Sequence, residues 1–337
     1  MDFVSHPKVS VIIPTYNRAD LLPRSIGSVL SQHFQDFELI VVNDGSTDET
    51  KDVLARYNDE RLKVVEFEQN RGIGAARSAG VFEARGEWVS FLDSDDLWRS
   101  EKLSYDLSIL NHYPEIDLLF DNYHNIHHIE QTDLFGFDQA HSAFALLETT
   151  ELKPDVFLIT SGLAEALITA NLIGTASIVT IRRAVFESIG NFNLALSGPE
   201  DFELFWRAAL ADVRFAYQTR VLVERHKNAD SITSHPQLFV PSLLEVYDLC
   251  ESTLARYKRS DLLALLNRAR LRAYMSLIRA YALEGQRVQA LQAFRQSLNY
   301  GFSAQSFFYS LVALTGPEVI AWINRVRKGR ISNSFHR

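Results

Sequence analysis

The sequence predicts an α/β fold, in which a mostly parallel sheet is flanked by helices, followed by an all-helical C-terminal extension. Apolar runs rich in β-branched residues start near residues 9, 37, 62 and 87, and segments with helical spacing separate them. This alternation, with one strand and one helix per unit, is typical of a parallel sheet covered by helices. From about residue 241 the pattern is helical throughout.

The individual elements follow from the apolar spacing and from residues that end strands or cap helices. The predicted strands are residues 9–13, 37–42, 62–67, 87–92 and 178–181. The predicted helices are residues 21–30, a segment capped by Thr47 or Asp48, residues 73–84, residues 97–110 and a segment that opens at Glu200.

Length and composition indicate a globular protein of two domains. The 337 residues divide at the change of pattern into predicted domains of residues 1–240 and 241–337. Hydrophobic residues make up 47% and charged residues 23%, which excludes a disordered chain. The single cysteine, Cys250, excludes a disulfide scaffold and fits a reducing compartment. No signal-peptide pattern precedes Val9, and no run of roughly 18 apolar residues occurs, so we expect a cytoplasmic protein.

Charge is distributed unevenly along the chain. The net charge of −8 argues against nucleic acid as a partner. Residues 251–337 hold 14 Lys and Arg against 4 Asp and Glu, a net charge of +10, whereas residues 1–250 hold the other 20 and 38, a net charge of −18. The basic helices can pair with the acidic part of the chain. Residues 319–330, where an apolar stretch precedes four Lys and Arg, predict peripheral contact with an anionic membrane.

Part of the helical extension has a repeat-like pattern. Residues 274–301 resemble one tetratricopeptide-type hairpin, with two helices around a short turn at Gly285. One such unit cannot bury its own apolar face, and the neighbouring segments match the pattern poorly. We therefore expect a helical extension that packs on the first domain rather than a repeat array.

Polar residues directly follow the first four predicted strands. They are Thr15-Tyr16-Asn17, Asp44, Asn70 and the segment from Asp93 to Asp96. A polar residue can simply end a strand. However, ligands of parallel α/β sheets bind outside the carboxyl ends of the strands, so four such positions favour one shared ligand site.

Three carboxylates are crowded into residues 93–96. Like charges this close repel one another, so Asp93, Asp95 and Asp96 predict a bound cation. Oxygen ligands on a tight turn suit Mg²⁺ or Mn²⁺, with phosphate oxygens completing the coordination shell. Alternatively, acidic residues can stabilise the N-terminus of the helix predicted over residues 97–110, a role that fits Asp96 best.

A second acidic pair, Glu200 and Asp201, opens a predicted amphipathic helix. Acidic residues are common in a first helical turn, so this pair alone is a weak signal. Beside a site for a metal and a diphosphate, one of the two carboxylates can act as a general base.

Taken together, the motifs resemble those of family 2 glycosyltransferases, which have the Rossmann-like GT-A fold. The matching segments are VSVIIPTYNR at 9–18, VNDGSTD at 42–48, NRGIGAARSAG at 70–80, FLDSDD at 91–96 and SIGNF at 188–192 followed by Glu200-Asp201. They lie in family order and cover roughly residues 8–235. Ser78 stands where the family often has Asn. Gly72 and Gly74 lack a third glycine at dinucleotide-fingerprint spacing, which makes a Rossmann dehydrogenase a poor alternative.

The resemblance implies roles in binding a nucleotide-diphospho-sugar. The implied binding residues are Pro14, Thr15, Tyr16, Asp44, Arg77, Asp93, Ser94 and Glu200. Within this set, Asp44 would accept the N–H of a uracil-like ring, and Asp93 would lie near the ribose. Arg77 would face the nucleotide or its phosphates, or alternatively would form a salt bridge on its helix.

The resemblance also implies a metal site and a base. Asp95 would hold Mn²⁺ or Mg²⁺, which bridges the diphosphate and stabilises the departing nucleotide. Asp201 would take the proton of an acceptor hydroxyl as that oxygen attacks the anomeric carbon, so that the configuration inverts. Glu200 would orient the site or contact the sugar or acceptor. His226 would reach the metal or the diphosphate, as in some family members, or would be structural.

The function implied is metal-assisted, inverting transfer of a hexosyl or N-acetylhexosaminyl group, with a UDP-sugar as the expected donor. The acceptor would be a hydroxyl of a glycan or lipid-linked glycan in cell-envelope polysaccharide biosynthesis. The location would be the cytoplasm, peripheral to the inner face of the cytoplasmic membrane. An inactive nucleotide-sugar or glycan binding module is the alternative, and the presence of both Asp95 and Asp201 argues against it. A nucleotidyltransferase would need a glycine-rich loop after Ile13, which is absent.

Overall fold

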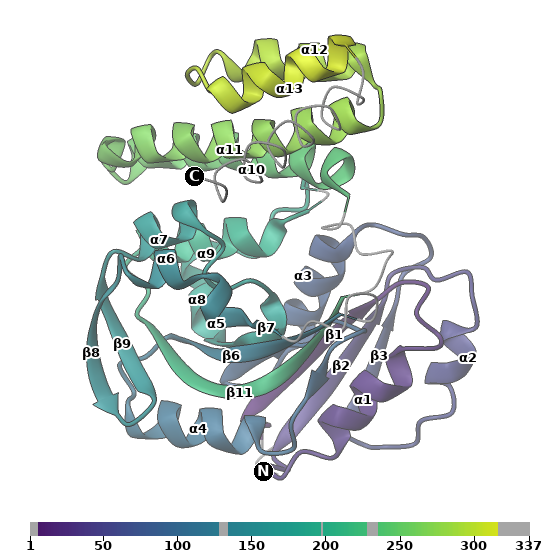
Figure 1. Ribbon diagram of the computed structural model, residues 1–337. Helices are drawn as coiled ribbons and strands as arrows, with labels where there is room; N and C mark the ends of the chain where they lie inside the picture. The colour runs from purple at the N-terminus through teal and green to yellow at the C-terminus, as the bar shows by residue number, and fades with distance from the viewer. Residues whose placement is uncertain (1–5, 128–133, 197, 228–234, 316–337) are drawn as a thin grey trace, which may run out of the picture. The chain divides into compact units, whose positions relative to one another are not determined.

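The computed structural model describes residues 6–127, 134–196, 198–227 and 235–315 (Figure 1). They divide into two compact units, an α/β unit within residues 1–229 and a helical unit within residues 230–337.

The α/β unit is built on an 11-stranded sheet of order β3-β2-β1-β4-β10-β6-β11-β9-β8, with β5 paired to β11 and β7 paired to β6. The strands are β1 Val9–Thr15, β2 Phe37–Asn43, β3 Leu62–Glu66, β4 Trp88–Phe91, β5 Leu97–Trp98, β6 Leu118–His127, β7 Leu134–Phe135, β8 Glu148–Lys153, β9 Val156–Ser161, β10 Val179–Arg182 and β11 Phe215–Lys227. The helices are α1 Leu22–Leu30, α2 Thr50–Leu54, α3 Ile73–Glu83, α4 Lys102–His112, α5 Gly136–Gln139, α6 His141–Phe144, α7 Leu163–Thr169, α8 Arg183–Ile189 and α9 Glu200–Leu210.

The first half of the sheet is parallel, as the strand–helix alternation predicts. β1 pairs in parallel with both β2 and β4, and β2 pairs in parallel with β3. All residues of β1 and β2 are buried, because α3 covers one face of the sheet and α1 the other (Figure 1). The close approach of α3 to β1 requires Gly80, since a side chain there would overlap Ile12.

Beyond β4 the sheet is mixed. β10 lies antiparallel between β4 and β6, and β11 is parallel to β6 but antiparallel to β9. The strand predicted at residues 178–181 is present as β10, Val179–Arg182. Its direction could not be predicted, because antiparallel neighbours need no crossover helix and leave no strand–helix alternation in the sequence.

The helix predicted over residues 97–110 is wrong at its start. Leu97 and Trp98 form β5, which pairs antiparallel with β11 at Glu224 and Val223. The helix itself, α4, begins at Lys102. The buried indole N–H of Trp98 donates to the Ser177 carbonyl at 2.8 Å, so burial and hydrogen bonding favour the strand here over another helical turn. The acidic segment at residues 93–96 is thereby held beside β11.

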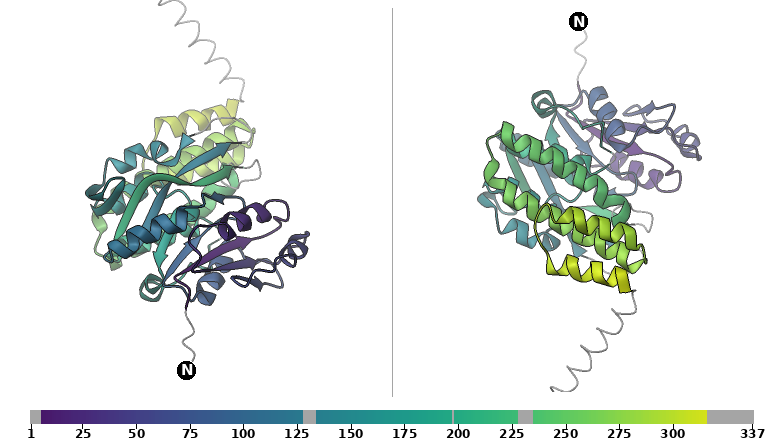
Figure 2. Two further views of the ribbon diagram at one scale, coloured as in Figure 1. Left: turned by 90° about the horizontal axis from the view of Figure 1, so that it is seen from below. Right: turned by 90° about the horizontal axis from the view of Figure 1, so that it is seen from above.

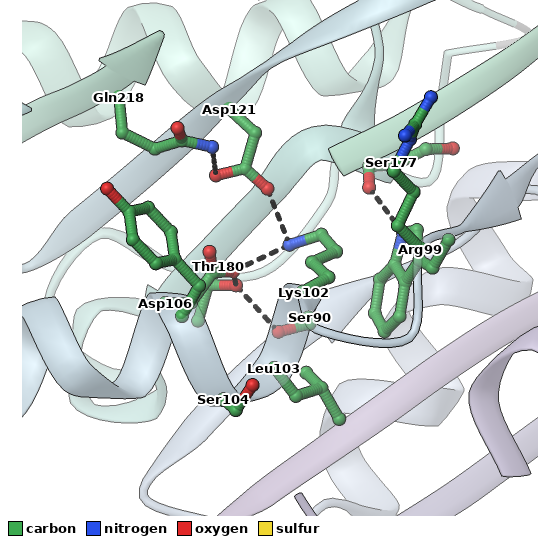
Figure 3. Close-up of polar contacts among 12 residues, drawn as sticks. Ser90, Arg99, Lys102, Leu103, Ser104, Asp106, Asp121, Ser177, Thr180 and Gln218 are labelled. Carbon is green, nitrogen blue, oxygen red and sulfur yellow. Dashed lines mark hydrogen bonds and ion pairs between the residues drawn. The ribbon is translucent and has the colours of Figure 1, made fainter. Parts of the chain in front are cut away.

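A buried polar network lies between α4 and the sheet (Figure 3). The Lys102 ammonium donates to Asp106 at 2.6 Å and lies 2.9 Å from an oxygen of Asp121. Gln218 donates to Asp121 at 2.7 Å, and Thr180 donates to Asp106 at 2.8 Å. All five side chains are fully buried. The network joins α4 to β6, β10 and β11 below the strand ends that carry the acidic segment.

This network holds two carboxyl groups against one ammonium group. Burial and the charge of Asp106 raise the pKa of Asp121 to about 8, against the opposing effect of Lys102. Burial alone would lower the pKa of Lys102, but the two carboxylates raise it overall. Asp121 is therefore easier to protonate than an ordinary carboxyl group, and protonation would remove one of the two buried negative charges.

The helical unit contains α10 Pro236–Arg256, α11 Leu263–Leu283, α12 Arg287–Ser297 and α13 Ala304–Thr315, which Figure 2 shows in succession. Helix α10 begins before residue 241, and Pro241 lies inside it. Residues 274–301 comprise the second half of α11, a turn with Gly285 at φ +74°, and α12. Residues 319–330 lie outside the described residues. Within the described residues, every helix is too short or too polar to span a membrane.

The raised pKa of Asp121 predicts a pH dependence of stability. A carboxyl group with a raised pKa in the folded state binds a proton on folding. Its stabilising contribution to the free energy of unfolding is therefore lost as pH rises from about 4 to about 8. The Asp121→Asn variant cannot bind this proton and should lose this pH dependence. Between about pH 4 and pH 8, the free energies of unfolding of wild type and variant should therefore diverge by an amount on the order of a few kcal/mol. Urea unfolding of both proteins at the two ends of this range measures it. Parallel pH dependences of wild type and variant would contradict the assignment.

Candidate active site

The polar residues that follow β1 and β2 are joined by hydrogen bonds at one edge of the sheet. The backbone N–H of Asp44 donates to the Thr15 carbonyl at 2.8 Å. The Asn17 N–H donates to the Ser46 hydroxyl at 2.9 Å, and the Thr47 N–H donates to the Asn17 side chain at 2.8 Å. The convergence expected for these strand ends is therefore present.

Asp44 connects this edge to the start of α3. Its two carboxylate oxygens accept the backbone N–H groups of Arg71 at 2.7 Å and Gly72 at 2.9 Å. Burial raises the pKa of Asp44, although these two hydrogen bonds oppose the rise. Asp44 thus shapes the loop before α3, and its predicted contact with a base N–H would use the remaining lone pairs.

The residues at the end of β1 differ in their access to a ligand. Pro14 and Thr15 are buried at the end of the strand, where Pro14 lies opposite Val42. Tyr16 is 42% exposed directly beyond it. Of these three predicted nucleotide-sugar-binding residues, only Tyr16 presents a largely exposed side chain.

Arg77 of α3 is the centre of a buried ion-pair network. Its guanidinium is 3% exposed and donates to Asp93 at 2.5 Å and to Glu200, the first residue of α9. Burial alone would lower the pKa of Arg77, but the charges of Asp93, Glu200 and Asp201 raise it above its ordinary value. The salt bridges of Arg77 therefore do not lie along its own helix but join the segment after β4 to the N-terminus of α9.

The acidic segment after β4 is held by a second set of hydrogen bonds. The Asp93 N–H donates to the Ser177 hydroxyl at 3.0 Å, and the Thr175 hydroxyl donates to the Asp93 carboxylate at 3.2 Å. The Ser177 hydroxyl donates in turn to one oxygen of Asp96 at 2.7 Å, and the backbone N–H of His226 donates to the other at 3.0 Å. His226 is therefore brought to this segment by its backbone, from β11.

The four residues of the segment have different surroundings. Asp96 is buried with both oxygens hydrogen-bonded, and it does not cap α4, because that helix starts only at Lys102. Ser94 is also buried, and its carbonyl accepts the Ser25 hydroxyl at 2.9 Å. Asp93 and Asp95 are partly exposed. These two carboxylates are therefore the ones that a ligand at the strand ends can reach.

Acidic groups outnumber basic groups at the site. Burial, together with the charge of Asp93, raises the pKa values of Asp95 and Asp96. Burial likewise raises the pKa of Asp201, with Arg77 opposing the rise. Burial raises the pKa of Glu200 to about 7. The charge of Asp201 adds to this rise, and the charge of Arg77 opposes it. A cation in the site would offset these charges, and perturbed carboxyl groups are typical of functional sites.

The residues fit a divalent cation that is shared with a ligand. Among the described residues, no group of three or more His, Cys, Asp or Glu side chains surrounds a common ion position. Mg²⁺ and related ions are often held by one or two carboxylates together with phosphate oxygens and water. Asp95, partly exposed and beside the charge of Asp93, fits such a shared site.

Four residues at the site were missed by sequence reasoning. Thr175 and Ser177 hold the acidic segment but were considered only as a lead into a strand. The charge of Arg225 opposes the rise in the pKa values of Asp95, Asp96 and Asp201, and that of Arg18 opposes the rise for Asp95. Arg225 directly precedes His226 in a segment that the resemblance covers, so its position was a usable signal. Ser and Thr before a short strand carry no such signal.

The fold is similar to that of a solved structure, S. aureus TarS 1-349 in complex with UDP-GlcNAc. The TM-score is 0.63 at 23% sequence identity, over 87% of this chain and 81% of that chain. The α/β unit therefore has the GT-A fold.

Sequence comparison finds a family match in the first part of the chain. Residues 10–134 match the family described as Glycosyl transferase family 2. A Bacillus subtilis (strain 168) protein named as a teichuronic acid biosynthesis glycosyltransferase, TuaG, is 44% identical over 106 residues, 31% of this chain and 42% of TuaG. The Escherichia coli protein WfgD, named as a UDP-Glc:alpha-D-GlcNAc-diphosphoundecaprenol beta-1,3-glucosyltransferase, is 36% identical over 115 residues, 34% of this chain and 45% of WfgD. The chain thus spans less than half the length of these two relatives. Residues 10–134 are thus similar to the family 2 glycosyltransferases.

The contacts of Ser177 predict that its hydroxyl stabilises the acidic segment. In the Ser177→Ala variant, the buried Asp96 carboxylate loses a donor and the Asp93 N–H loses its acceptor. The free energy of unfolding should fall by about 1–3 kcal/mol. Ser108→Ala removes an exposed hydroxyl from α4 and is the matched control, expected to change stability by less than about 0.5 kcal/mol. Equal stability of the two variants in urea unfolding would contradict this role.

Proposed function

We propose that this protein is an inverting glycosyltransferase that moves a sugar from a UDP-sugar to a hydroxyl of a glycan or lipid-linked glycan. The observation that carries the proposal is the buried ion-pair network through Arg77. It connects Asp93, in the segment expected to bind the donor, with Glu200, which is adjacent to the expected base Asp201. Donor-binding and proton-accepting groups therefore belong to one electrostatic unit.

Asp201 is the proposed general base. It lies in the first turn of α9, and burial raises the pKa of its carboxyl group. A raised pKa makes a carboxylate a better proton acceptor near neutral pH. As the acceptor oxygen attacks the anomeric carbon, its proton passes to Asp201 and the bond from that carbon to the diphosphate oxygen breaks. A single displacement inverts the configuration and requires no covalent enzyme intermediate.

Asp95 is the proposed protein ligand of a divalent cation, Mn²⁺ or Mg²⁺, and His226 is the proposed neighbour of that ion or of the diphosphate. When bound, the cation would neutralise the charge that develops on the departing nucleotide. Arg18, in the loop after β1, and Arg225, in β11, act electrostatically on Asp95 and would face the same diphosphate. Glu200, held by Arg77, would orient the sugar or acceptor.

The printed names of similar proteins support the donor and the acceptor class. WfgD is named for a UDP-sugar donor and a diphosphoundecaprenol-linked acceptor, and TarS was solved with UDP-GlcNAc. We extend both to this chain, with Tyr16 and Asp44 at the base and a lipid-linked glycan as the acceptor. A cytoplasmic location and peripheral contact of residues 319–330 with an anionic membrane belong to the same proposal.

Asp201→Asn tests the proposal, because it removes the base while keeping the shape of the side chain. We expect transfer to fall by about 10²–10⁴-fold, as for other general bases. UDP with Mn²⁺ should still raise the melting temperature of the variant, as any ligand selective for the folded state must do. Transfer from UDP-sugars to a lipid-linked acceptor and a thermal-shift assay measure the two effects.

Two further variants complete this experiment. Asp95→Ala should abolish the metal-dependent thermal shift with UDP, whereas Asp52→Asn, an exposed carboxylate on α2, should change neither measurement. GDP, dTDP and CDP, each with Mn²⁺ or with EDTA, identify the nucleotide. A UDP shift without transfer in the wild type would favour an inactive binding module. Full transfer by Asp201→Asn would exclude Asp201 as the base.

A further inference from the structure

The helical unit exposes large apolar side chains on two neighbouring helices. We call this set the α12–α13 apolar face, and its members are 36–67% exposed. They are Val288, Leu291, Leu298, Phe302, Phe307, Leu311 and Leu314. Figure 2 shows α12 and α13 lying side by side within the unit.

Helical spacing places these residues on one side of each helix. Phe307, Leu311 and Leu314 follow one another at intervals of four and three residues along α13, which puts them in a single stripe. The rest of α13 has its own buried side chains, because Val312 and Ala313 pack in a core cluster with Ala282 and Ala290. Helix α13 therefore has a buried side and, separately, an exposed apolar side.

The stripes of the two helices meet through their aromatic rings. The Phe307 ring lies 6.0 Å from that of Phe294 on α12 and 6.1 Å from that of Phe302 in the connection between the helices. Leu291 and Leu298 flank Phe294 at intervals of three and four residues on α12. The exposed side chains thus form one surface across both helices.

The charge of the same helices is strongly one-sided. Residues 263–315 contain six arginines and one acidic residue, Glu284. Arg270 is buried and paired with Asp248 and Glu251 of α10. The other five are exposed. They are Arg268, Arg272, Arg279, Arg287 and Arg295.

We propose that the α12–α13 apolar face docks on an anionic lipid surface. Apolar side chains beside arginines are the two components that hold a peripheral helix at a membrane. The first enter the boundary between headgroups and acyl chains, and the second attract anionic headgroups. Arg287 and Arg295 lie on α12 among the exposed apolar residues, so both components occur on one element.

Charge pairing inside the protein does not account for this face. Acidic groups of the α/β unit could neutralise the arginines, but carboxylates do not account for the exposure of the apolar side chains. A second copy of the chain could bury the apolar residues, but it would bring arginine-rich helices with the same charge together. An anionic bilayer satisfies the apolar and the basic groups at once.

The inference deepens the proposed function, since a lipid-linked acceptor would be presented at such a surface. It does not depend on catalysis, because binding to vesicles is measured without donor or acceptor. Failure of vesicle binding and failure of sugar transfer are therefore separate results.

Sedimentation of the full-length protein with lipid vesicles tests the inference. We expect binding to vesicles of phosphatidylcholine with phosphatidylglycerol, and much weaker binding to phosphatidylcholine alone. Changing Phe307, Leu311 and Leu314 together to Ser should weaken binding to the anionic vesicles at least about tenfold. Phe82→Ser, which removes an exposed aromatic ring from α3, is the matched control and should leave binding unchanged.

A variant of residues 319–330 separates this surface from the basic C-terminal segment. In this variant, four basic residues are changed to Gln: Arg325, Arg327, Lys328 and Arg330. It should still bind anionic vesicles more tightly than the triple Ser variant does. Wild-type affinity of the triple Ser variant would overturn the inference, as would equal binding of the wild type to neutral and anionic vesicles. Light scattering adds a further test. If the triple Ser variant changes the protein from a dimer to a monomer and leaves vesicle binding intact, the face is a contact between copies instead.

Discussion

The buried guanidinium of Arg77 is the interaction on which the site depends. It contacts Asp93, which follows β4, and Glu200, which begins α9. These residues are separated by more than 100 positions in the sequence, and Arg77 itself comes from a third element, α3. A charge with this little exposure is tolerated only when it is paired and hydrogen-bonded. Arg77 therefore requires both carboxylates in place, and it fixes α9 relative to the strand ends.

Around this centre, hydrogen bonds position the remaining groups. Asp44 joins the end of β2 to the start of α3, and Ser177 joins Asp93 to Asp96. Below them, the Lys102 network ties α4 to the sheet, and the Lys102 ammonium lies 4.7 Å from the centre of the Trp98 ring. Trp98 in turn donates to Ser177. These contacts hold the acidic segment in place and leave Asp93 and Asp95 partly exposed.

Much of this arrangement could be predicted from sequence, for identifiable reasons. Strands β1 to β4 were found because apolar runs alternate with helical spacing, and the acidic positions were found because parallel strands end at one edge. The partners of those acids could not be found in this way. Ser177 and Arg225 act across β10 and β11, and pairing beyond β4 leaves no periodic signal. The strand at Leu97 and Trp98 was taken for helix because its pairing with β11 is a tertiary contact.

The helical unit also shows what sequence pattern could not predict. Its helices were expected, and its basic charge could be counted, but exposure could not be inferred from apolar spacing alone. Phe307, Leu311 and Leu314 have the spacing of core residues, yet they lie on the outside of α13.

A double-mutant cycle tests the central claim about Arg77 most directly. Urea unfolding of Arg77→Met, Glu200→Gln and the double variant should give a coupling free energy on the order of 1–3 kcal/mol. Additive effects of the two substitutions would contradict a direct role of this ion pair in holding α9 to α3.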